Sequence, residues 1–216
     1  MKTYRILARL LDYPTAPLVA ALPELRALLV AEDVLPPAPR AAVIGLMERL
    51  ATADLIDSQA IHVQHFDRVR TLSLHLFEHV HGDARSRGQA MVDLVELYRR
   101  HGLDVTAKEL PDYLPLVLEF FSVMAPGAAR EHLAETTPIL ARLKARLEAR
   151  GSDYASLFDA LIAIAAIKVA PVAIDGDPDE ESPEAIDRAW EDAAVTFGAA
   201  PPAKDECGGA PRFVAR

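Results

Sequence analysis

The stretch ILARLKARLEAR, residues 139–150, decides the fold class of this chain. Its apolar residues recur every three or four positions, which places them on one face of an α-helix with basic residues between them. Those apolar residues are Ile139, Leu140, Leu143 and Leu147. The same spacing recurs at Val43, Leu46, Met47 and Leu50, whereas the alternation typical of strands does not recur. The pattern predicts an all-α fold in which strands are absent or trivial.

Helix-breaking residues divide the chain into segments and predict six to eight helices. Gly102 and Gly151 each follow a charged last turn, which is the usual end of a helix. Asp112 precedes Tyr113-Leu114-Pro115, so we expect Asp112 to cap a helix with proline in its first turn. The other breakers are Pro14, Pro23, the cluster at residues 36–39, Gly82, Pro111, Pro126 and Pro171. We expect these helices to form a single globular domain over residues 1–172.

The composition changes after residue 172, and residues 173–216 are expected to form an acidic, Pro- and Gly-containing, largely disordered tail. Residues 175–192 alone carry −8 of the chain's net charge of −9. Such a segment cannot bury enough apolar surface to offset its ordering entropy, so we expect it to be mobile. An island around Trp190 and Phe197 is the exception, and it is either a helical turn that docks transiently on the body or a motif that binds a partner.

Charge and cysteine usage exclude several classes of protein. The remainder of the chain carries −1 and has no basic face, which argues against nucleic acid as a partner. Cys207 is the one cysteine. It excludes a disulfide framework, a cysteine-based zinc site and an iron–sulfur cluster, and it suits the reducing cytoplasm. The first residues lack a small-residue cleavage site, so we expect no signal peptide.

Residues 154–174 are apolar over about the length that spans ~30 Å of hydrocarbon. Asp159 and Lys168 interrupt this segment, and Pro171 ends it. A helix that is apolar on nearly all sides is also what the centre of a soluble bundle requires. We therefore expect a buried helix and not an integral membrane protein.

His75, Glu78 and His79 match the H-x-x-E-H pattern of inverted zinc peptidases. On an α-helix, the two histidines would share a face and Glu78 could polarise a zinc-bound water. The pattern is short, however, and such a site needs a further carboxylate ligand within a cleft. Hydrogen bonds between helices and surface pairs are the more ordinary roles of these residues. We expect no metal site, and a zinc hydrolase stays as an outlying alternative.

Other catalytic patterns are absent from the sequence. It contains no G-x-S-x-G motif and no phosphate-binding loop. Cys207 lies beside two glycines in the expected tail, where no base is positioned to activate it. We expect no catalytic residues and no cofactor of the protein's own, so the sequence favours a non-enzyme.

Two segments resemble one known family. They are residues 66–94, which include SLHLFEHVHGDARSRGQAMVDL at positions 73–94, and residues 109–120, which begin with ELPDYLP. Together they resemble the NarJ family, the delta-subunit chaperones of respiratory nitrate reductase, within the wider TorD/DmsD-like group of maturation chaperones. The likeness extends from residues 7–14 to about Val169, and two short pieces of the tail share it. Tyr113 follows the Pro-Asp pair where export-linked relatives tend to carry histidine, which favours the nitrate reductase branch.

The resemblance implies a dedicated chaperone of multi-helix TorD/NarJ-like fold. Such proteins bind the N-terminal segment of the catalytic alpha subunit while it lacks its cofactor. They keep this subunit competent for molybdenum cofactor insertion and delay its docking at the membrane until it is loaded. Proteins that deliver the cofactor are further partners in this picture. The alternative is a maturation or export-guiding chaperone for another molybdoenzyme.

The candidate peptide-binding residues come from the two resembling segments and their flanks. We expect apolar anchors ringed by acidic side chains that pair with a basic peptide end. The candidates are Phe66, Asp67, Arg68, Leu72, His75, Leu76, Glu78, His79, Asp112, Tyr113, Leu114, Glu119 and Phe120. Apolar residues at helical spacing belong more often to the core than to a groove, and the sequence alone does not separate the two roles.

Overall fold

The computed structural model describes residues 1–80, 85–105 and 109–167. Within these ranges the chain forms eight α-helices and two short 3-10 helices, and no strand. The elements are α1 (Lys2–Leu11), α2 (Ala16–Glu32), α3 (Pro37–Thr52), α4 (Leu55–Phe66), η1 (Arg70–Leu72), η2 (Leu76–His79), α5 (Arg85–Arg100), α6 (Leu114–Val123), α7 (Pro126–Ala149) and α8 (Ala155–Ala165). The all-α prediction is confirmed. The predicted tail and its boundary at residue 172 lie outside the described residues.

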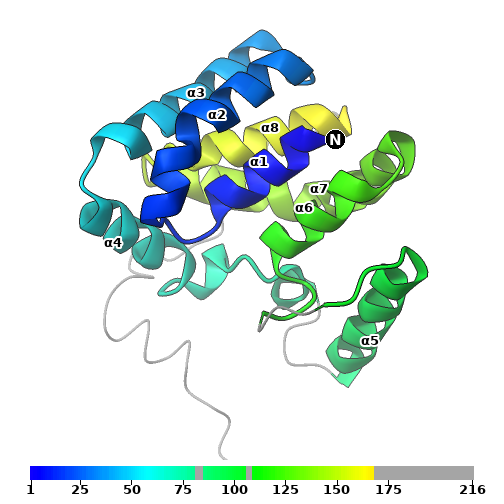
Figure 1. The fold of residues 1–216 in the computed structure, drawn as a ribbon. Coiled ribbons are helices and arrows are strands. Elements are labelled where there is room, and N and C mark those ends of the chain that lie inside the picture. The colour runs from blue at the N-terminus through cyan, green and yellow to red at the C-terminus, as the bar shows by residue number, and fades with distance from the viewer. Residues whose placement is uncertain (81–84, 106–108, 168–216) are drawn as a thin grey trace, which may run out of the picture.

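Helix α8 lies at the centre of the bundle. It packs along α7 and α3, and α1 in turn packs on α6 and α2 (Figure 1). Leu157, Phe158 and Leu161 of α8 are completely buried. The apolar segment that begins at Tyr154 is therefore a buried helix as far as the structure describes it, as predicted. Across the described ranges, the structure holds no helix with the length and apolar character needed to cross a membrane.

Two helix ends show how local chemistry fixes the bundle. Thr15 caps α2 by accepting a hydrogen bond from the Leu18 amide at 3.3 Å. Glu32, at the end of α2, accepts hydrogen bonds from the Lys2 and Thr3 amides at 2.8 and 2.5 Å. The carboxylate thus satisfies donors at the start of α1, where the helix dipole favours negative charge. These bonds hold α1 against the C-terminal end of α2.

One predicted helix break is wrong. Pro23 lies inside α2 and does not end it. Proline removes a single backbone hydrogen bond. Because Pro23 is exposed, water can bind the carbonyl that loses its partner. Gly102 and Gly151 do follow helices as predicted, with φ of 74° and 64°, values that glycine adopts without strain.

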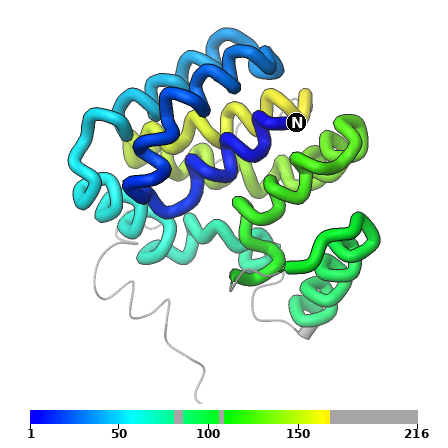
Figure 2. The backbone as a smooth tube through the Cα atoms, in the orientation of Figure 1, coloured from blue at the N-terminus to red at the C-terminus, as the bar shows by residue number. Residues whose placement is uncertain are grey.

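Helix α5 lies beside the bundle and not within it (Figure 2). Its C-terminal end is attached through Tyr98, which is buried. The Tyr98 hydroxyl donates to the Pro111 carbonyl at 2.7 Å, and its ring lies 4.7 Å from that of Phe120. This attachment places residues 98–105 next to α6, where they form one wall of the cavity described below.

Candidate functional site

The two segments that carry the sequence resemblance lie side by side. We call residues 73–79 and 112–114 the motif junction. His75 and Tyr113 form an isolated antiparallel β-bridge. The Leu76 amide donates to the Asp112 carbonyl at 3.1 Å, and the Leu114 amide donates to the Leu74 carbonyl at 2.9 Å. Segments that are almost forty positions apart in sequence are thus joined by backbone hydrogen bonds.

Asp112 is the polar centre of the motif junction, and its side chain is completely buried. One carboxylate oxygen accepts from the Phe77 amide at 3.0 Å, and the other lies 3.3 Å from Nδ1 of His75. Asp112 was predicted to be a helix cap, which is wrong because the N-cap of α6 is Tyr113. The Asp112 side chain instead faces the opposite segment. There the Phe77 amide and the His75 imidazole supply the hydrogen bonds that a buried carboxylate needs.

The histidines do not form the predicted helical pair. His75 precedes the 3-10 helix η2 and His79 is its last residue, so they do not share the face of an α-helix. Nε2 of His79 donates to the Ser73 carbonyl at 2.8 Å, and Glu78 pairs with Arg87 at 3.3 Å. Among the described residues, no group of three or more side chains is placed to hold a metal ion.

The environments of these two histidines shift their pKa values in opposite directions. The hydrogen bond to Asp112 raises the pKa of His75. Burial lowers the pKa of His79, and the nearby guanidinium of Arg146 adds to that effect. His75 therefore keeps its proton to higher pH than an ordinary histidine, while His79 is held neutral.

Most apolar candidates belong to the core. Five of them are buried, namely Phe66, Leu72, Leu76, Leu114 and Phe120. Among the polar candidates, Asp67 and Arg68 are exposed at the end of α4, and Tyr113 and Glu119 are half-buried. His75, Glu78 and His79 of the motif junction are half-buried as well. The candidates that a partner can reach are therefore polar or amphipathic side chains.

A cavity of about 370 Å³ lies between α1, α6 and residues 98–105. We call it the α6 groove. Of the predicted residues only Glu119 and Phe120 line it. The sequence did not identify the remaining apolar lining, because two of these residues lie in the loop after α5 and the other two are ordinary apolar residues of α6. They are Leu103, Val105, Leu116 and Val123.

Burial and nearby negative charge act on Tyr113, the N-cap residue of α6. Burial raises the pKa of Tyr113, and the carboxylates of Asp12, Glu109 and Asp67 raise it further. These three carboxylates do not line the α6 groove, whose acidic lining residues are Asp104 and Glu119. The guanidinium of Arg9 lies 3.7 Å from Asp12 and 3.1 Å from Glu119. Tyr113, Leu116, Phe120 and Val123 follow one stripe of α6.

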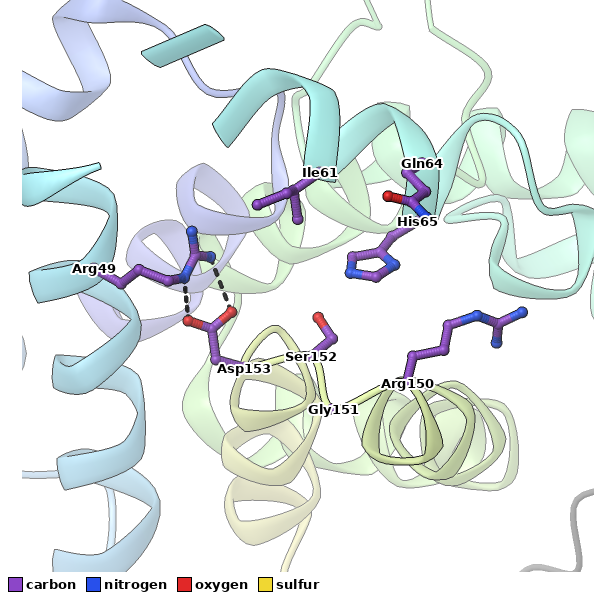
Figure 3. Close-up of a pocket in the computed structure, with 8 residues that line it drawn as sticks. All are labelled: Arg49, Ile61, Gln64, His65, Arg150, Gly151, Ser152 and Asp153. Carbon is purple, nitrogen blue, oxygen red and sulfur yellow. Dashed lines mark hydrogen bonds and ion pairs between the residues drawn. The ribbon is translucent and has the colours of Figure 1, made fainter. Parts of the chain in front are cut away.

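A second cavity, of about 510 Å³, opens between α3, α4 and the turn from α7 to α8 (Figure 3). Arg49 of α3 forms a two-point ion pair with Asp153, in which Nη2 donates to Oδ1 at 2.9 Å. Figure 3 shows His65 and Gln64 of α4 across from Ser152. The ion pair ties α3 to the start of α8, and no predicted site residue lines this cavity.

Comparison with known proteins gives one consistent result. Residues 16–160 match the family model for the nitrate reductase delta subunit. The chain is 44% identical over 201 residues, 89% of its length and 83% of the relative's, to the nitrate reductase molybdenum cofactor assembly chaperone NarJ of Escherichia coli. It is 43% identical over 152 residues, 68% of its length and 66% of the relative's, to the probable chaperone NarW of the same organism. A probable NarJ from Bacillus subtilis is 31% identical over 161 residues, 74% of this chain and 86% of that one.

Proposed function

The chain belongs to the nitrate reductase delta subunit family, and on that premise we propose that it is an assembly chaperone for nitrate reductase. The main support for this proposal is the 44% identity to the Escherichia coli assembly chaperone over 89% of the chain. In this role the protein assists molybdenum cofactor insertion into the reductase and catalyses no reaction itself. It acts in the cytoplasm, before the reductase docks at the membrane.

In the proposed mechanism, the chaperone binds the N-terminal segment of the cofactor-free alpha subunit in the α6 groove. The segment binds as an amphipathic helix whose apolar face packs on Leu116 and Val123. Val123 is 60% exposed beside the apolar lining of the groove. A partner side chain that covers Val123 removes apolar surface from water, which favours binding by ~25 cal/mol for each Å² buried.

The charges around the groove suit a partner segment that also carries basic residues. Asp67 and Glu109 are exposed, and Glu119 is half-buried beside Arg9. Glu119 and the exposed Asp104 line the groove itself, so they pair with cations at the partner's rim without being fully desolvated. The buried candidates contribute differently, because Leu76, Leu114 and Phe120 support the groove from beneath.

Occupation of the groove explains how the chaperone acts on assembly. A segment held by the chaperone is not free to contact the membrane partner of the reductase. Release after cofactor loading then permits docking. The chaperone needs no cofactor of its own for this, and proteins that deliver the molybdenum cofactor are its further partners in the proposal.

Titration calorimetry with the full-length chain tests the proposal. The probe is a synthetic peptide copying the first fifteen residues of the alpha subunit encoded in the same genome, and the control is its scrambled sequence. We expect saturable binding of the first peptide alone, with a negative heat capacity change from buried apolar surface. Equal binding of both peptides, or of neither, contradicts the proposal.

The main alternative is a chaperone for another molybdoenzyme. The same measurement with N-terminal peptides from the other molybdoenzymes of that genome separates the two. Tighter binding of one of those peptides than of the nitrate reductase peptide would reassign the client while leaving the chaperone role in place.

A further inference from the structure

We propose that the acidic C-terminal segment of this chain docks on its own body, on a surface of arginines at the end of α7 and on the cavity of Figure 3. Residues 175–187 pair with the arginines, and Trp190 enters the cavity. The inference does not depend on the α6 groove or on a client. It names the binding place of the island around Trp190, which the sequence leaves open between the body and a partner.

The first observation is a basic surface that forms only on folding. Arg142, Arg146 and Arg150 recur every four residues and form one stripe at the C-terminal end of α7. The short helix η1 packs on α7, and the Arg146 guanidinium donates to the Thr71 carbonyl at 2.8 Å. The prediction that the body has no basic face is wrong here, because the arginines come from segments about seventy positions apart. We call Arg68, Arg70, Arg142, Arg146 and Arg150 the arginine surface.

The carboxylates of the neighbouring elements leave most of this positive charge in place. Glu78, Glu148 and Asp153 each form an ion pair with a cation outside the arginine surface. Asp67, which is exposed beside Arg68 in the chain, offsets one charge. The surface therefore carries about +4 on a chain whose net charge is −9. A basic surface of this size attracts an anionic ligand.

The second observation is the cavity of about 510 Å³ that adjoins the arginine surface. Arg150 belongs to both, and Figure 3 shows its side chain on the opposite side of the cavity from Arg49. Ile61, which is 37% exposed, supplies an apolar wall, and His65 supplies an aromatic ring. An indole suits this lining, because it packs on aliphatic side chains and is attracted to a guanidinium that lies over its ring.

The third observation is that the chain itself carries a matching ligand. Residues 175–192 carry −8, and Trp190 lies near the end of this run. Acidic residues followed by an aromatic residue have the same order as the stripe of α7 followed by the cavity. A segment that runs along α7 toward Arg150 therefore brings its carboxylates to the guanidinium groups and its indole to the cavity.

The connection to the body is long enough for this arrangement. Ile167, the last residue that the structure describes, follows α8, and the cavity lies at the start of that helix. The 11 residues of α8 span about 17 Å, whereas residues 168–189 can extend over about 70 Å. A tethered segment has an effective concentration on the order of 1 mM. This advantage favours the chain's own acidic segment over a separate acidic protein.

A docked segment changes what the body presents to its surroundings. A bare arginine surface attracts nucleic acid and anionic lipid, since both are polyanions. The acidic segment pairs with the same guanidinium groups and competes with those polyanions. It is therefore an intramolecular ligand that limits nonspecific contacts of the body.

The fluorescence of Trp190, the one tryptophan of the chain, tests the inference directly. Its emission is recorded for the full-length wild type and for Arg142→Gln/Arg150→Gln. The matched control is Arg26→Gln/Arg100→Gln, which removes the same charge from exposed arginines of α2 and α5. We expect the wild type and the control to emit at shorter wavelength than the chain unfolded in urea, and the first variant to emit like the unfolded chain. In 1 M salt the wild-type emission should shift in the same direction.

Disulfide formation locates the contact independently. In a Cys207→Ser background, Ala189→Cys is combined with Gln64→Cys at the cavity or with Val30→Cys on α2 as the control. We expect the first pair to form an intramolecular disulfide at least about ten-fold faster than the second. Equal rates, or a Trp190 emission that responds alike to both arginine variants or to neither, overturn the inference. A disulfide between two chains, seen as a dimer on a non-reducing gel, overturns it as well and assigns the surface to a second copy.

Discussion

The motif junction and the α6 groove lie next to each other but have opposite construction. The junction contains the most distinctive sequence in the chain, and its centre, Asp112, is completely buried and bonded to Phe77 and His75. The groove contains ordinary residues such as Leu116 and Val123, and part of its surface is open to solvent. The distinctive residues hold two distant segments together, and the unremarkable ones offer a surface to a partner.

The candidate binding residues thus have two different roles: those of the junction stabilise the fold, and those of the groove contact a partner. A buried carboxylate is costly to leave unpaired, so the choice of residue at position 112 is tightly constrained by stability. A half-exposed valine on a helix is constrained by stability very little. Variants in the two regions are therefore expected to fail in different measurements.

Replacing Phe120 by alanine should give the largest loss of stability. Phe120 is 3% exposed, and its ring contacts those of Tyr98, His101 and Phe121. We expect the free energy of unfolding to fall by about 3–5 kcal/mol for Phe120→Ala, against about 0.5 kcal/mol for Val123→Ala three residues further along. Urea unfolding followed by circular dichroism measures both. Equal losses would mean that the floor of the groove is not part of the core.

Removing the Asp112 carboxylate should have the next largest effect. Asp112→Ala leaves the Phe77 amide and the His75 imidazole without their acceptor. We expect a loss of about 2–3 kcal/mol in the free energy of unfolding. The control is Glu119→Ala, which removes a surface ion pair with Arg9 and should cost less than about 1 kcal/mol. An Asp112→Ala protein as stable as the wild type would remove the structural role assigned to the junction.

The stabilisation supplied by His75 should depend on pH with a defined sign. Because the hydrogen bond to Asp112 raises the pKa of His75, the folded state binds that proton more tightly than the unfolded chain. The contribution of protonated His75 to the free energy of unfolding is complete below the ordinary histidine pKa of about 6.5. It is lost as pH rises through the raised pKa of His75 in the folded protein. The difference in unfolding free energy between wild type and His75→Gln should therefore shrink from pH 5.5 to 8.5. If the difference in unfolding free energy instead grew with pH, Asp112 would not be the partner that stabilises protonated His75.

The sequence predicted the helical architecture but not the division of roles within it. Periodicity identified α3 and α7, because the spacing of apolar residues along the chain shows which face of a helix is buried. It misjudged Asp112, since an acidic residue before a helix looks like a cap whichever way its side chain turns. It also took His75 and His79 as neighbours on an α-helix, although tertiary pairing with residues 112–114 winds that segment as a short 3-10 helix.

The residues that line the α6 groove were the hardest to predict from the sequence. Glu119 and Phe120 were among the candidates, whereas Leu103, Val105 and Val123 were not. These residues come from a loop and a helix end that meet only after folding, and none belongs to a recognisable motif. Their joint exposure is a tertiary property that a single residue's chemistry does not reveal.

The smallest effect should come from the ion pair at the edge of the junction. Arg87 and Glu78 lie 3.3 Å apart and are both partly exposed. We expect Arg87→Ala to lower the free energy of unfolding by less than about 1 kcal/mol, and by still less in 1 M salt. Urea unfolding at two salt concentrations measures this. A loss as large as that of Asp112→Ala would extend the rigid junction to the start of α5.

The most direct test of the account compares two exposed valines in binding. Val123 lines the α6 groove and is 60% exposed, and Val30 lies on α2 and is 47% exposed. Each is replaced by glutamine, and the affinity of the full-length chain for the alpha-subunit N-terminal peptide is measured by calorimetry. We expect Val123→Gln to weaken binding about ten-fold or more, because it places a polar group in a buried apolar contact, while Val30→Gln binds like the wild type. Wild-type affinity for Val123→Gln in a folded protein, or an equal loss in both variants, would contradict the assignment of the groove.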